Sequence, residues 1–519
     1  MDQIVIPPDL DAAPPPTPAL TPNSLPPAYP SYAVLLRSAL HPQLLILYSY
    51  FALIAWLLRR VVFRSVLAER IGRKAGWETG TWCALAALSL GSTWTYMLRY
   101  FSHSYNVWLS GAHLTGLAIP SLPVCPRTSS LLSSCHVSLL STRLQRLSLW
   151  LTHTSLFTES WLQVTSHPAA WWWSAEVCLF TVGVFTLFLS AQRTRVGVPY
   201  AWAYMLLGQT VAMSFAAALF GLALSLREVG EGSLLQVARA GRFAGEERVG
   251  RVVRVEVQED EQGAMVETTT RQYILECPST HPSLASRLIT WAGVGLASLC
   301  VWSRPTTLPQ VLWMHLLPLV LLLPRAALTD RLEALLHPHP RSDDAEGTRA
   351  SNERLRALLR PSNLFGALAA YNFVARLRQA GDVVSLVVRE VPALQLHRYG
   401  TMRVVGKLLY PTTFHSHPAQ SSIGSDAVCL GLVTLVYIGM DAVRSNHPRT
   451  RLVAALLALA TPLVGPSATL SAWLAVRERE VEEAECRDEE RLRKEAGQGV
   501  GLVVEEEEQR VVRARGKTE

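Results

Sequence analysis

The sequence predicts an all-α polytopic membrane protein, with about eight transmembrane helices and a small extramembrane β-hairpin. The chain of 519 residues is 49% hydrophobic and 17% charged, whereas an average soluble domain is roughly 25% charged. The charges are also segregated, because the apolar runs hold almost none of them. The net charge of +7 is small for this length. Its arginines lie beside apolar runs, which indicates topology signals and argues against a nucleic-acid surface.

The most informative stretch runs from Trp171 to Leu226. It holds two apolar runs that reach or approach the roughly 20 residues needed to cross a hydrocarbon core as a helix. The triple Trp at its start suits the membrane–water interface. Arg193 and Arg195 lie in the short connection between the runs. Because short cytoplasmic loops carry an excess of Lys and Arg, we predict a transmembrane hairpin, residues 171–226, with a cytoplasmic turn.

The segments before this hairpin follow the same logic. Residues 1–42 are a Pro-rich tail, which we predict to be disordered and not a signal peptide. Residues 43–98 hold transmembrane helices 1 and 2, around a loop with six cations between Arg59 and Lys74. That loop should stay cytoplasmic, which places the N-terminus on the far side. Residues 99–170 form a loop with an amphipathic helix from Leu144 to Val164. A ninth crossing there is the alternative.

The chain has eight cysteines, and no two of them form a C-x-x-C motif. No Cys/His spacing matches a zinc site, so we expect no metal and no cofactor. Cys125 and Cys135 share the loop of residues 99–170, and they can form a disulfide if that loop is lumenal.

Residues 227–287 are predicted to be a polar loop with a β-hairpin. Arg251 to Gln258 and Met265 to Glu276 show roughly period-2 alternation around a central turn. An open two-stranded edge would leave backbone groups unpaired in lipid, so the hairpin must lie outside the membrane. Residues 288–323 follow as transmembrane helices 5 and 6, joined by a turn that carries Arg304.

The last part of the chain alternates between polar and apolar regions. Residues 324–426 form a polar and amphipathic region, and residues 427–476 hold transmembrane helices 7 and 8 around a basic turn, Arg444–Arg451. Residues 477–519 form a charged tail. If the short loops after helices 1, 3, 5 and 7 are all cytoplasmic, both termini face the far side. Within residues 324–426 we expect helical segments at Leu328–Leu336 and Asn352–Leu359, a surface or re-entrant helix at Leu364–Leu377, and a strand at Val383–Val388.

Part of the chain resembles a group of multi-span membrane proteins of filamentous fungi. The resemblance rests on the runs WWWSAE from Trp171, FTVGVFT from Phe180, WAYMLLGQ from Trp202 and SFA from Ser214. It covers roughly Leu144 to Leu226. That group has no assigned activity, so the resemblance implies the source and the membrane class and carries over no functional residue.

No catalytic motif is present, since the chain lacks G-x-S-x-G, H-E-x-x-H, a P-loop, and a G-x-G-x-x-G after a strand. Whether the protein is an enzyme stays open. Polar side chains at membrane depth are candidate sites, because burying them is costly. The candidates for substrate binding are Glu176, Gln209, His315 and Asp441. Each candidate also has a structural alternative: Glu176 would sit at a helix N-terminus, Gln209 would form an interhelical hydrogen bond, His315 would be a hydrogen-bonded packing residue, and Asp441 would pair with Arg444. Asp426 is expected to cap helix 7.

Glu176 and Gln209 lie at similar distances from the basic turn of the hairpin, roughly 15 residues before it and 14 after it. At a rise of about 1.5 Å per residue, both side chains should lie about 20 Å from the turn. We therefore expect them to share a hydrogen bond inside the bundle.

The leading hypothesis for function is an integral membrane protein that binds or transports a hydrophobic small molecule or lipid. The number of spans and the Pro and Gly interruptions in helix 8 favour it, although the halves show no inverted repeat. One alternative is a membrane-embedded enzyme of lipid or secondary metabolism, and another is a membrane scaffold or biogenesis factor. The expected partners are the lipid bilayer and a hydrophobic small molecule, with no nucleic acid, in the endomembrane system or the plasma membrane.

Overall fold

The computed structural model confirms that the protein is predominantly helical. Residues 1–31 of the predicted Pro-rich tail, the segment Leu328–Leu336 and most of Asn352–Leu359 lie outside the described residues. The tail was predicted to be disordered up to residue 42, and this is wrong for Tyr32–Ala39, which form a helix. The structure describes residues 32–66, 76–125, 134–195, 198–228, 247–259, 265–276, 284–305, 307–323, 355, 358–392, 400–445, 448–497 and 505–511.

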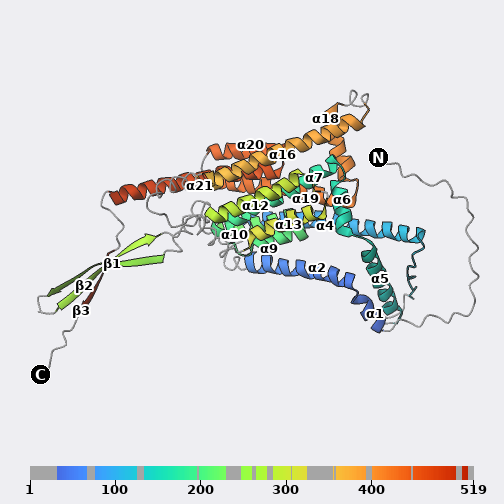
Figure 1. Ribbon diagram of the computed structural model, residues 1–519, viewed down its shortest axis with the longest axis horizontal. Helices are drawn as coiled ribbons and strands as arrows, with labels where there is room; N and C mark the ends of the chain where they lie inside the picture. The colour runs from blue at the N-terminus through green and yellow to red at the C-terminus, as the bar shows by residue number, and fades with distance from the viewer. Residues whose placement is uncertain are drawn as a thin grey trace, which may run out of the picture. The chain divides into compact units, whose positions relative to one another are not determined.

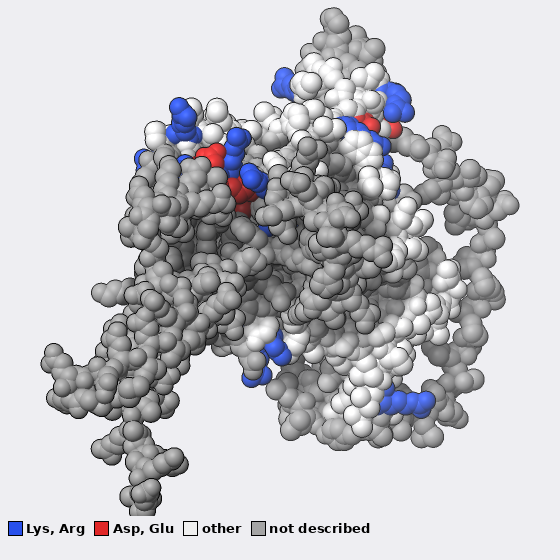
Figure 2. Space-filling view, turned by 60° about the vertical axis from the view of Figure 1, so that its left-hand side comes forward, with Lys and Arg blue, Asp and Glu red and all other residues white. Residues whose placement is uncertain are grey.

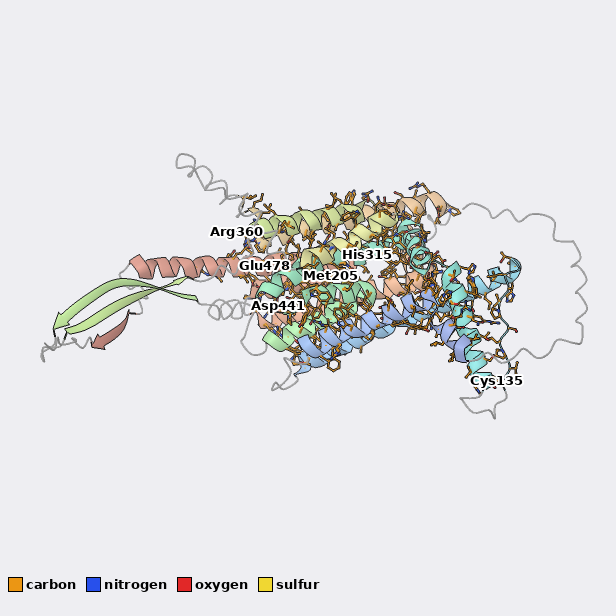
Figure 3. All side chains as sticks on the ribbon, turned by 60° about the horizontal axis from the view of Figure 1, so that its bottom comes forward. Cys135, Met205, His315, Arg360, Asp441 and Glu478 are labelled. Carbon is orange, nitrogen blue, oxygen red and sulfur yellow. A yellow bond between two sulfur atoms is a disulfide. The ribbon has the colours of Figure 1, made fainter. Side chains whose placement is uncertain are left out.

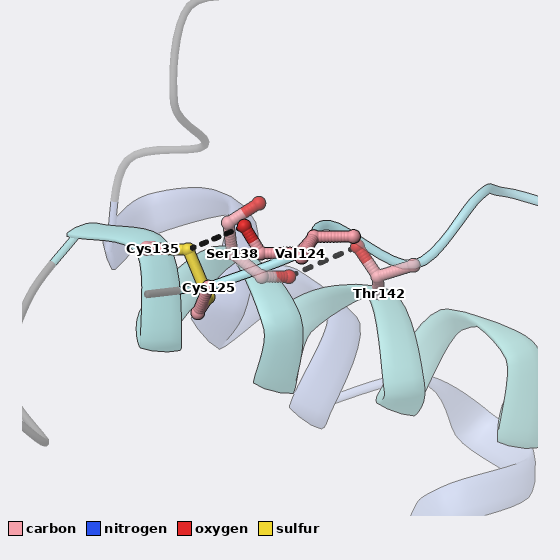
Figure 4. Close-up of a disulfide and its surroundings, with 5 residues drawn as sticks. All are labelled: Val124, Cys125, Cys135, Ser138 and Thr142. Atoms are coloured by element: carbon pink, nitrogen blue, oxygen red, sulfur yellow. Dashed lines mark hydrogen bonds between the residues drawn. A yellow bond between two sulfur atoms is a disulfide. The ribbon is translucent and has the colours of Figure 1, made fainter. Parts of the chain in front are cut away.

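The chain divides into two units, of which the first comprises Met1–Tyr48 and Trp108–Thr154. In it, α1 (Tyr32–Ala39) packs against α5 (Ser134–His153), and Gln145 Nε2 donates to Ser38 Oγ at 3.3 Å. The sequence left open whether Cys125 and Cys135 form a disulfide. The bond is present and joins the preceding segment to the first turn of α5 (Figure 4). The amphipathic helix predicted at Leu144–Val164 is two helices, because α5 ends at His153 and α6 begins at Leu156.

The second unit comprises Ser49–Val107 and Ser155–Glu519 and holds most of the helices. The π-helical segments η1, η2 and η3 continue the helices that precede them without a break. The helices that lie wholly or partly in this unit are α2 (Pro42–Leu58), η1 (Arg59–Val66), α4 (Trp77–Leu114), α6 (Leu156–Thr165), α7 (Pro168–Leu179), η2 (Phe180–Phe185), α8 (Thr186–Arg195), α9 (Ala201–Thr210), α10 (Met213–Glu228), α12 (Leu284–Trp302), α13 (Leu308–Leu322), α16 (Pro361–Glu390), α18 (Thr401–Lys407), η3 (Leu408–Phe414), α19 (Pro418–Arg444), α20 (Pro448–Val464) and α21 (Pro466–Gly497).

Two long helices pack side by side at the centre of this unit (Figure 1). One is α7 continued by η2 and α8, and the other is α19. They run in the same direction. Near their starts Gln420 Nε2 donates to the Ala170 carbonyl at 3.4 Å, and near their ends the rings of Phe188 and Tyr437 lie 5.2 Å apart. The α7 segment is buried on almost every side.

Both long helices begin with the same dipeptide, His-Pro. Pro at the first helical position removes an N–H that has no partner there. The preceding histidine caps the helix: His167 Nδ1 accepts from Ala170 N at 3.3 Å and His417 Nδ1 from Ala419 N at 3.2 Å. Burial, with the Arg304 cation nearby, lowers the pKa of His167. A neutral imidazole keeps the lone pair that this cap requires.

The prediction that residues 200–226 form one straight crossing is wrong, because α9 and α10 fold back on each other. The rings of Tyr204 and Phe220 lie 5.2 Å apart, whereas 16 residues of continuous helix would span about 24 Å. Only Val211 and Ala212 separate the two helices. Gly208 lies so close to Met213 that a Cβ would overlap the Met213 side chain. The pair is therefore a helical hairpin with both open ends at one end of the unit.

The prediction of a single eighth transmembrane helix is also wrong, because α20 and α21 fold back on each other. Thr450 Oγ1 in α20 donates to Glu480 Oε1 in α21 at 2.6 Å, although 30 residues of straight helix would span about 45 Å. The turn is at Gly465, whose φ of 86° lies in the left-handed region that favours glycine. The α20–α21 pair is a second helical hairpin.

Two sets of contacts define the ends of the second unit. At the Arg444 end, Arg444 pairs with Glu78, and the Arg60 guanidinium lies 5.3 Å from the Tyr200 ring centroid. At the His167 end, Arg304 donates to the Thr165 carbonyl. The Arg304 turn was predicted to lie beside the other basic turns, and it lies at the opposite end. The fold-back of α9–α10 is the reason, because it returns the chain to the Arg444 end before α12 begins.

Helix α16 replaces two predicted elements. The segment Leu364–Leu377 and the predicted strand Val383–Val388 are both parts of this one helix of 30 residues. Ser362, at its start, binds Glu482 of α21 (Ser362 Oγ to Glu482 Oε2, 2.6 Å). In its second half Arg378 donates to the Trp302 carbonyl at 3.2 Å. The helix thus runs between the two ends of the unit with Asn372 and Arg376 buried.

The alternating segments form strands β1 (Glu247–Glu259) and β2 (Met265–Glu276), which pair antiparallel from Glu247↔Glu276 to Glu259↔Met265. A third strand, β3 (Glu505–Val511), pairs antiparallel with β2 and completes a sheet of order β1-β2-β3. The predicted turn over residues 260–264 lies outside the described residues.

Within the part of the chain that the structure describes, three helices are long and apolar enough to cross a membrane: Pro42–Phe63, Pro168–Gln192 and Pro418–Arg444. Shorter apolar helices occur at Met213–Leu226, Arg287–Trp302 and Pro309–Leu322. In the face shown in Figure 2, uncharged atoms cover most of the described surface, and charged side chains gather in a few groups.

Spin labels at positions 449 and 479 test the second fold-back, since both native arginines are exposed. Packed helices lie 8–10 Å apart, so electron–electron distance measurements on Arg449→Cys/Arg479→Cys, with the other free cysteines replaced, should give about 15–25 Å. A distance near 45 Å would instead establish one straight helix.

Candidate functional site

A cavity of about 350 Å³ surrounds the tip of the α9–α10 hairpin, within the second unit. Six consecutive residues, Gly208 to Met213, form one wall. The other walls come from α2, α4, α6, α7 with η2, α13 and α19, and most of the lining side chains are apolar or aromatic. Its size falls within the range of about 300–1,000 Å³ that is usual for ligand sites.

Asp426 of α19 lies against the tip and is 4% exposed. Its Oδ2 accepts from Met213 N at 3.0 Å, and its Oδ1 accepts from Ser214 N at 2.8 Å. These are N–H groups of the first turn of α10, which have no partner within their own helix. A carboxylate satisfies them and also interacts favourably with the positive end of the helix dipole.

Two of the residues predicted for substrate binding, Gln209 and His315, meet in this cavity. Gln209 Nε2 donates to the His315 carbonyl at 2.9 Å, which joins α9 to α13. His315 Nδ1 lies 2.8 Å from the Val311 carbonyl. Because a carbonyl only accepts, Nδ1 carries the proton, and Nε2 of the neutral ring is an acceptor. The His315 ring also contacts Phe157 and Trp161, at centroid distances of 6.4 and 6.1 Å.

Glu176 caps the start of α21, in the α20–α21 hairpin. Its Oε1 accepts from Ser467 N at 2.7 Å, in the first turn of α21. Its Oε2 lies 3.8 Å from Arg376 Nε of α16, and both side chains are nearly fully buried. Gly465 passes so close that a Cβ there would overlap the Glu176 carboxylate. The predicted hydrogen bond between Glu176 and Gln209 is therefore wrong, because the fold-back of α9–α10 gives each residue a different partner.

Arg376 is held from several sides. Its Nη1 donates to the Trp172 carbonyl at 2.7 Å and to Gln379 Oε1 at 3.1 Å. Its guanidinium carbon lies 3.2 Å from the Trp172 ring centroid. These contacts fix the cation beside Glu176, so the pair acts as a buried structural clamp on the α20–α21 tip.

Asp441, the fourth predicted candidate, lies away from the cavity, near the Arg444 end (Figure 3). Its Oδ2 accepts from Trp473 Nε1 and from Arg477 Nε, each at 2.9 Å. The predicted partner was Arg444, and the ion pair that the structure forms is with Arg477. Among the described residues no group of three His, Cys, Asp or Glu side chains is placed to hold a metal ion.

The sequence contains a signal for the two carboxylates. The tetrapeptide Ser-His-Pro-Ala occurs at residues 166–169 and again at 416–419, and an acid follows eight residues after each Pro, at Glu176 and Asp426. Each long helix is followed by a helical hairpin. Each acid caps the hairpin that belongs to the other copy, so the caps are exchanged. The two copies run in the same direction, and the repeat is therefore parallel and not inverted.

Comparison of the chain with family models, with curated proteins and with solved structures finds no match. The resemblance to fungal multi-span proteins stays a prediction.

Gly465→Ala tests the clamp at the second tip. A side chain in the left-handed conformation costs about 1–2 kcal/mol, and the added methyl would also displace the Glu176 carboxylate from Ser467 N. We expect a loss of at least about 2 kcal/mol in stability, measured by thermal unfolding in detergent. Gly431→Ala is the control, since open space surrounds Gly431 in α19. Equal stability of both variants would contradict the close approach.

Proposed function

We propose that the protein is a multi-pass integral membrane protein that binds or moves a hydrophobic small molecule or lipid in the cavity at the α9–α10 tip. The observation that carries this proposal is an apolar cavity built around a helical hairpin whose tip is capped by a buried carboxylate. Interrupted helices with ligand sites at their broken ends are a recurrent plan in membrane transporters.

Apolar side chains on the outside of the helices support a lipid environment. On α20, Leu452, Leu456, Leu459 and Leu463 are each 58–76% exposed. Their spacing places them along one face of the helix. On α13, Trp313 is 62% exposed. Contiguous apolar faces of this kind are unfavourable in water and typical of contact with lipid.

The proposed topology has seven crossings and two re-entrant hairpins. The crossings are α2, α4, α7 with η2 and α8, α12, α13, α16 and α19, and the hairpins α9–α10 and α20–α21 enter and leave at the Arg444 end. An α9 of 10 residues is about 15 Å long, half the hydrocarbon thickness. The basic segments near Arg60, Arg193 and Arg444 then share the cytoplasmic side.

This arrangement places the N-terminus and the C-terminus on opposite sides. It also places the segment that follows α4, which holds the Cys125–Cys135 disulfide, on the far side. Disulfides persist in oxidising compartments such as the lumen or the exterior. The β1–β2 hairpin then belongs to the cytoplasmic, extramembrane part of the chain.

A membrane-embedded enzyme is a second candidate function, favoured by one observation. Asp426 and His315 line the same cavity, and a carboxylate and a neutral imidazole are common acid–base groups. Conversion of a bound ligand, followed by mass spectrometry, would distinguish an enzyme from a binding protein or transporter.

Single cysteines at positions 303 and 449 test the topology, because both native side chains are exposed. In sealed vesicles of known orientation, an impermeant maleimide should label Ser303→Cys from the far side and Arg449→Cys only after permeabilisation. Labelling of both positions from one side would restore the eight-crossing alternative.

Filling the cavity tests its role in binding. Ile423 lines the cavity and is partly buried. The larger side chain of Ile423→Trp should fill part of the cavity and weaken binding of the neutral fluorophore N-phenyl-1-naphthylamine about tenfold or more. Leu459→Trp, on the outer face of α20, should bind the probe as the unmodified protein does. Equal affinity in all three proteins, measured by fluorescence titration, would remove the cavity from the proposal.

A further inference from the structure

The two capping carboxylates differ in one respect that bears on the ligand. Glu176 has Arg376 beside it. Asp426 has the same place in the repeat, but no Lys or Arg among the described residues forms an ion pair with it. Among the described residues, the fold thus supplies a cation at the α20–α21 tip and none at the α9–α10 tip, which faces the cavity.

The backbone compensates only part of the Asp426 charge. A helix N-terminus is equivalent to roughly half a positive charge, which is less than the full negative charge of a carboxylate. Each carboxylate oxygen accepts one backbone N–H and can accept a second hydrogen bond. Asp426 lines the cavity, and no Lys, Arg or other acid does so among the described residues.

Most hydrogen-bond donors of the lining are engaged within the protein, and the buried Thr93 hydroxyl is an exception, because it has no hydrogen-bond partner among the described residues. Six lining side chains donate to backbone carbonyls: Tyr50, Tyr100, Trp161, Ser174, Thr181 and Ser422. His315 uses its Nδ1 proton in the same way, so Nε2 is an acceptor. The cavity therefore offers acceptors and is poor in donors, which disfavours an anionic ligand.

Aromatic rings supply the remaining recognition. Tyr50, Tyr100, Phe157 and Trp161 all line the cavity. The faces of such rings attract cations, and desolvation strengthens that attraction. One carboxylate among several aromatic rings and apolar side chains is the chemistry that selects a cation with an apolar body.

We propose that the ligand of this cavity is a lipophilic monocation, such as an amphiphilic or quaternary amine, and that Asp426 is its counter-ion. The inference rests on the proposed function, and it adds the charge class of the ligand. It assigns Asp426 to recognition and leaves Glu176 as a structural residue.

Three probes of nearly equal shape test the charge preference on the unmodified full chain in nanodiscs, by calorimetry against empty nanodiscs. They are benzyltrimethylammonium, its neutral carbon isostere neopentylbenzene, and phenylmethanesulfonate. We expect the cation to bind at least about tenfold more tightly than the neutral compound and the anion not to bind. Equal binding of the cation and the neutral compound would overturn the charge assignment while leaving the proposed function intact.

Two variants assign the effect to a residue. Asp426→Asn should lower the affinity for the cation about tenfold or more and change that for the neutral probe less than twofold. Glu176→Gln, the matched acid of the other copy, should keep the cation affinity within twofold. Loss of cation binding in Glu176→Gln but not in Asp426→Asn would overturn the proposal. The three-probe comparison needs no variant, so it decides the matter even if Asp426→Asn does not fold. Failure of all three probes to bind would count against the proposed function as well.

Discussion

The structure depends on how two helix N-termini are satisfied inside an apolar interior. A helix that begins in the middle of a bundle exposes N–H groups that cannot bond within the helix, and water is not there to replace the missing partner. Asp426 and Glu176 supply that partner for α10 and α21. Each acid stands on the long helix of the other copy, so the two hairpins and the two long helices are held as one unit.

The two capping carboxylates have different surroundings at the two hairpin tips. Beside Glu176, the buried Arg376 and the close approach of Gly465 leave a filled, ion-paired contact. Removing one partner of a buried pair is strongly destabilising, because the remaining charge is then uncompensated. Beside Asp426 the structure leaves a cavity of about 350 Å³. The repeated arrangement is thus filled and ion-paired at one tip and borders a cavity at the other.

The sequence predicted the apolar helices and the alternating segments, because composition and periodicity report burial directly. It did not predict the fold-back of α9–α10, since Val211 and Ala212 turn the chain without a polar, Pro or Gly residue between the helices. It missed α16 as a helix between both ends of the unit, because Asn372 and Arg376 resemble interruptions until their partners, Ser471 and Glu176, are known. Of the candidate residues, Gln209 and His315 meet in the cavity. Glu176 and Asp441 lie elsewhere and pair with Arg376 and Arg477. The sequence did not predict these pairs, because each partner stands on a different helix and only the packing of the helices brings it close.

The most direct test of the exchanged caps is amide hydrogen exchange at the two tips, followed by mass spectrometry in nanodiscs. If the carboxylates hold the tips as described, Asp426→Ala should increase exchange in the peptide that contains Met213 and Ser214 and leave the α20–α21 tip protected. Glu176→Ala should do the reverse, at Ser467. If each substitution instead loosened the hairpin that follows its own helix in the chain, or if neither tip responded, the account would be contradicted.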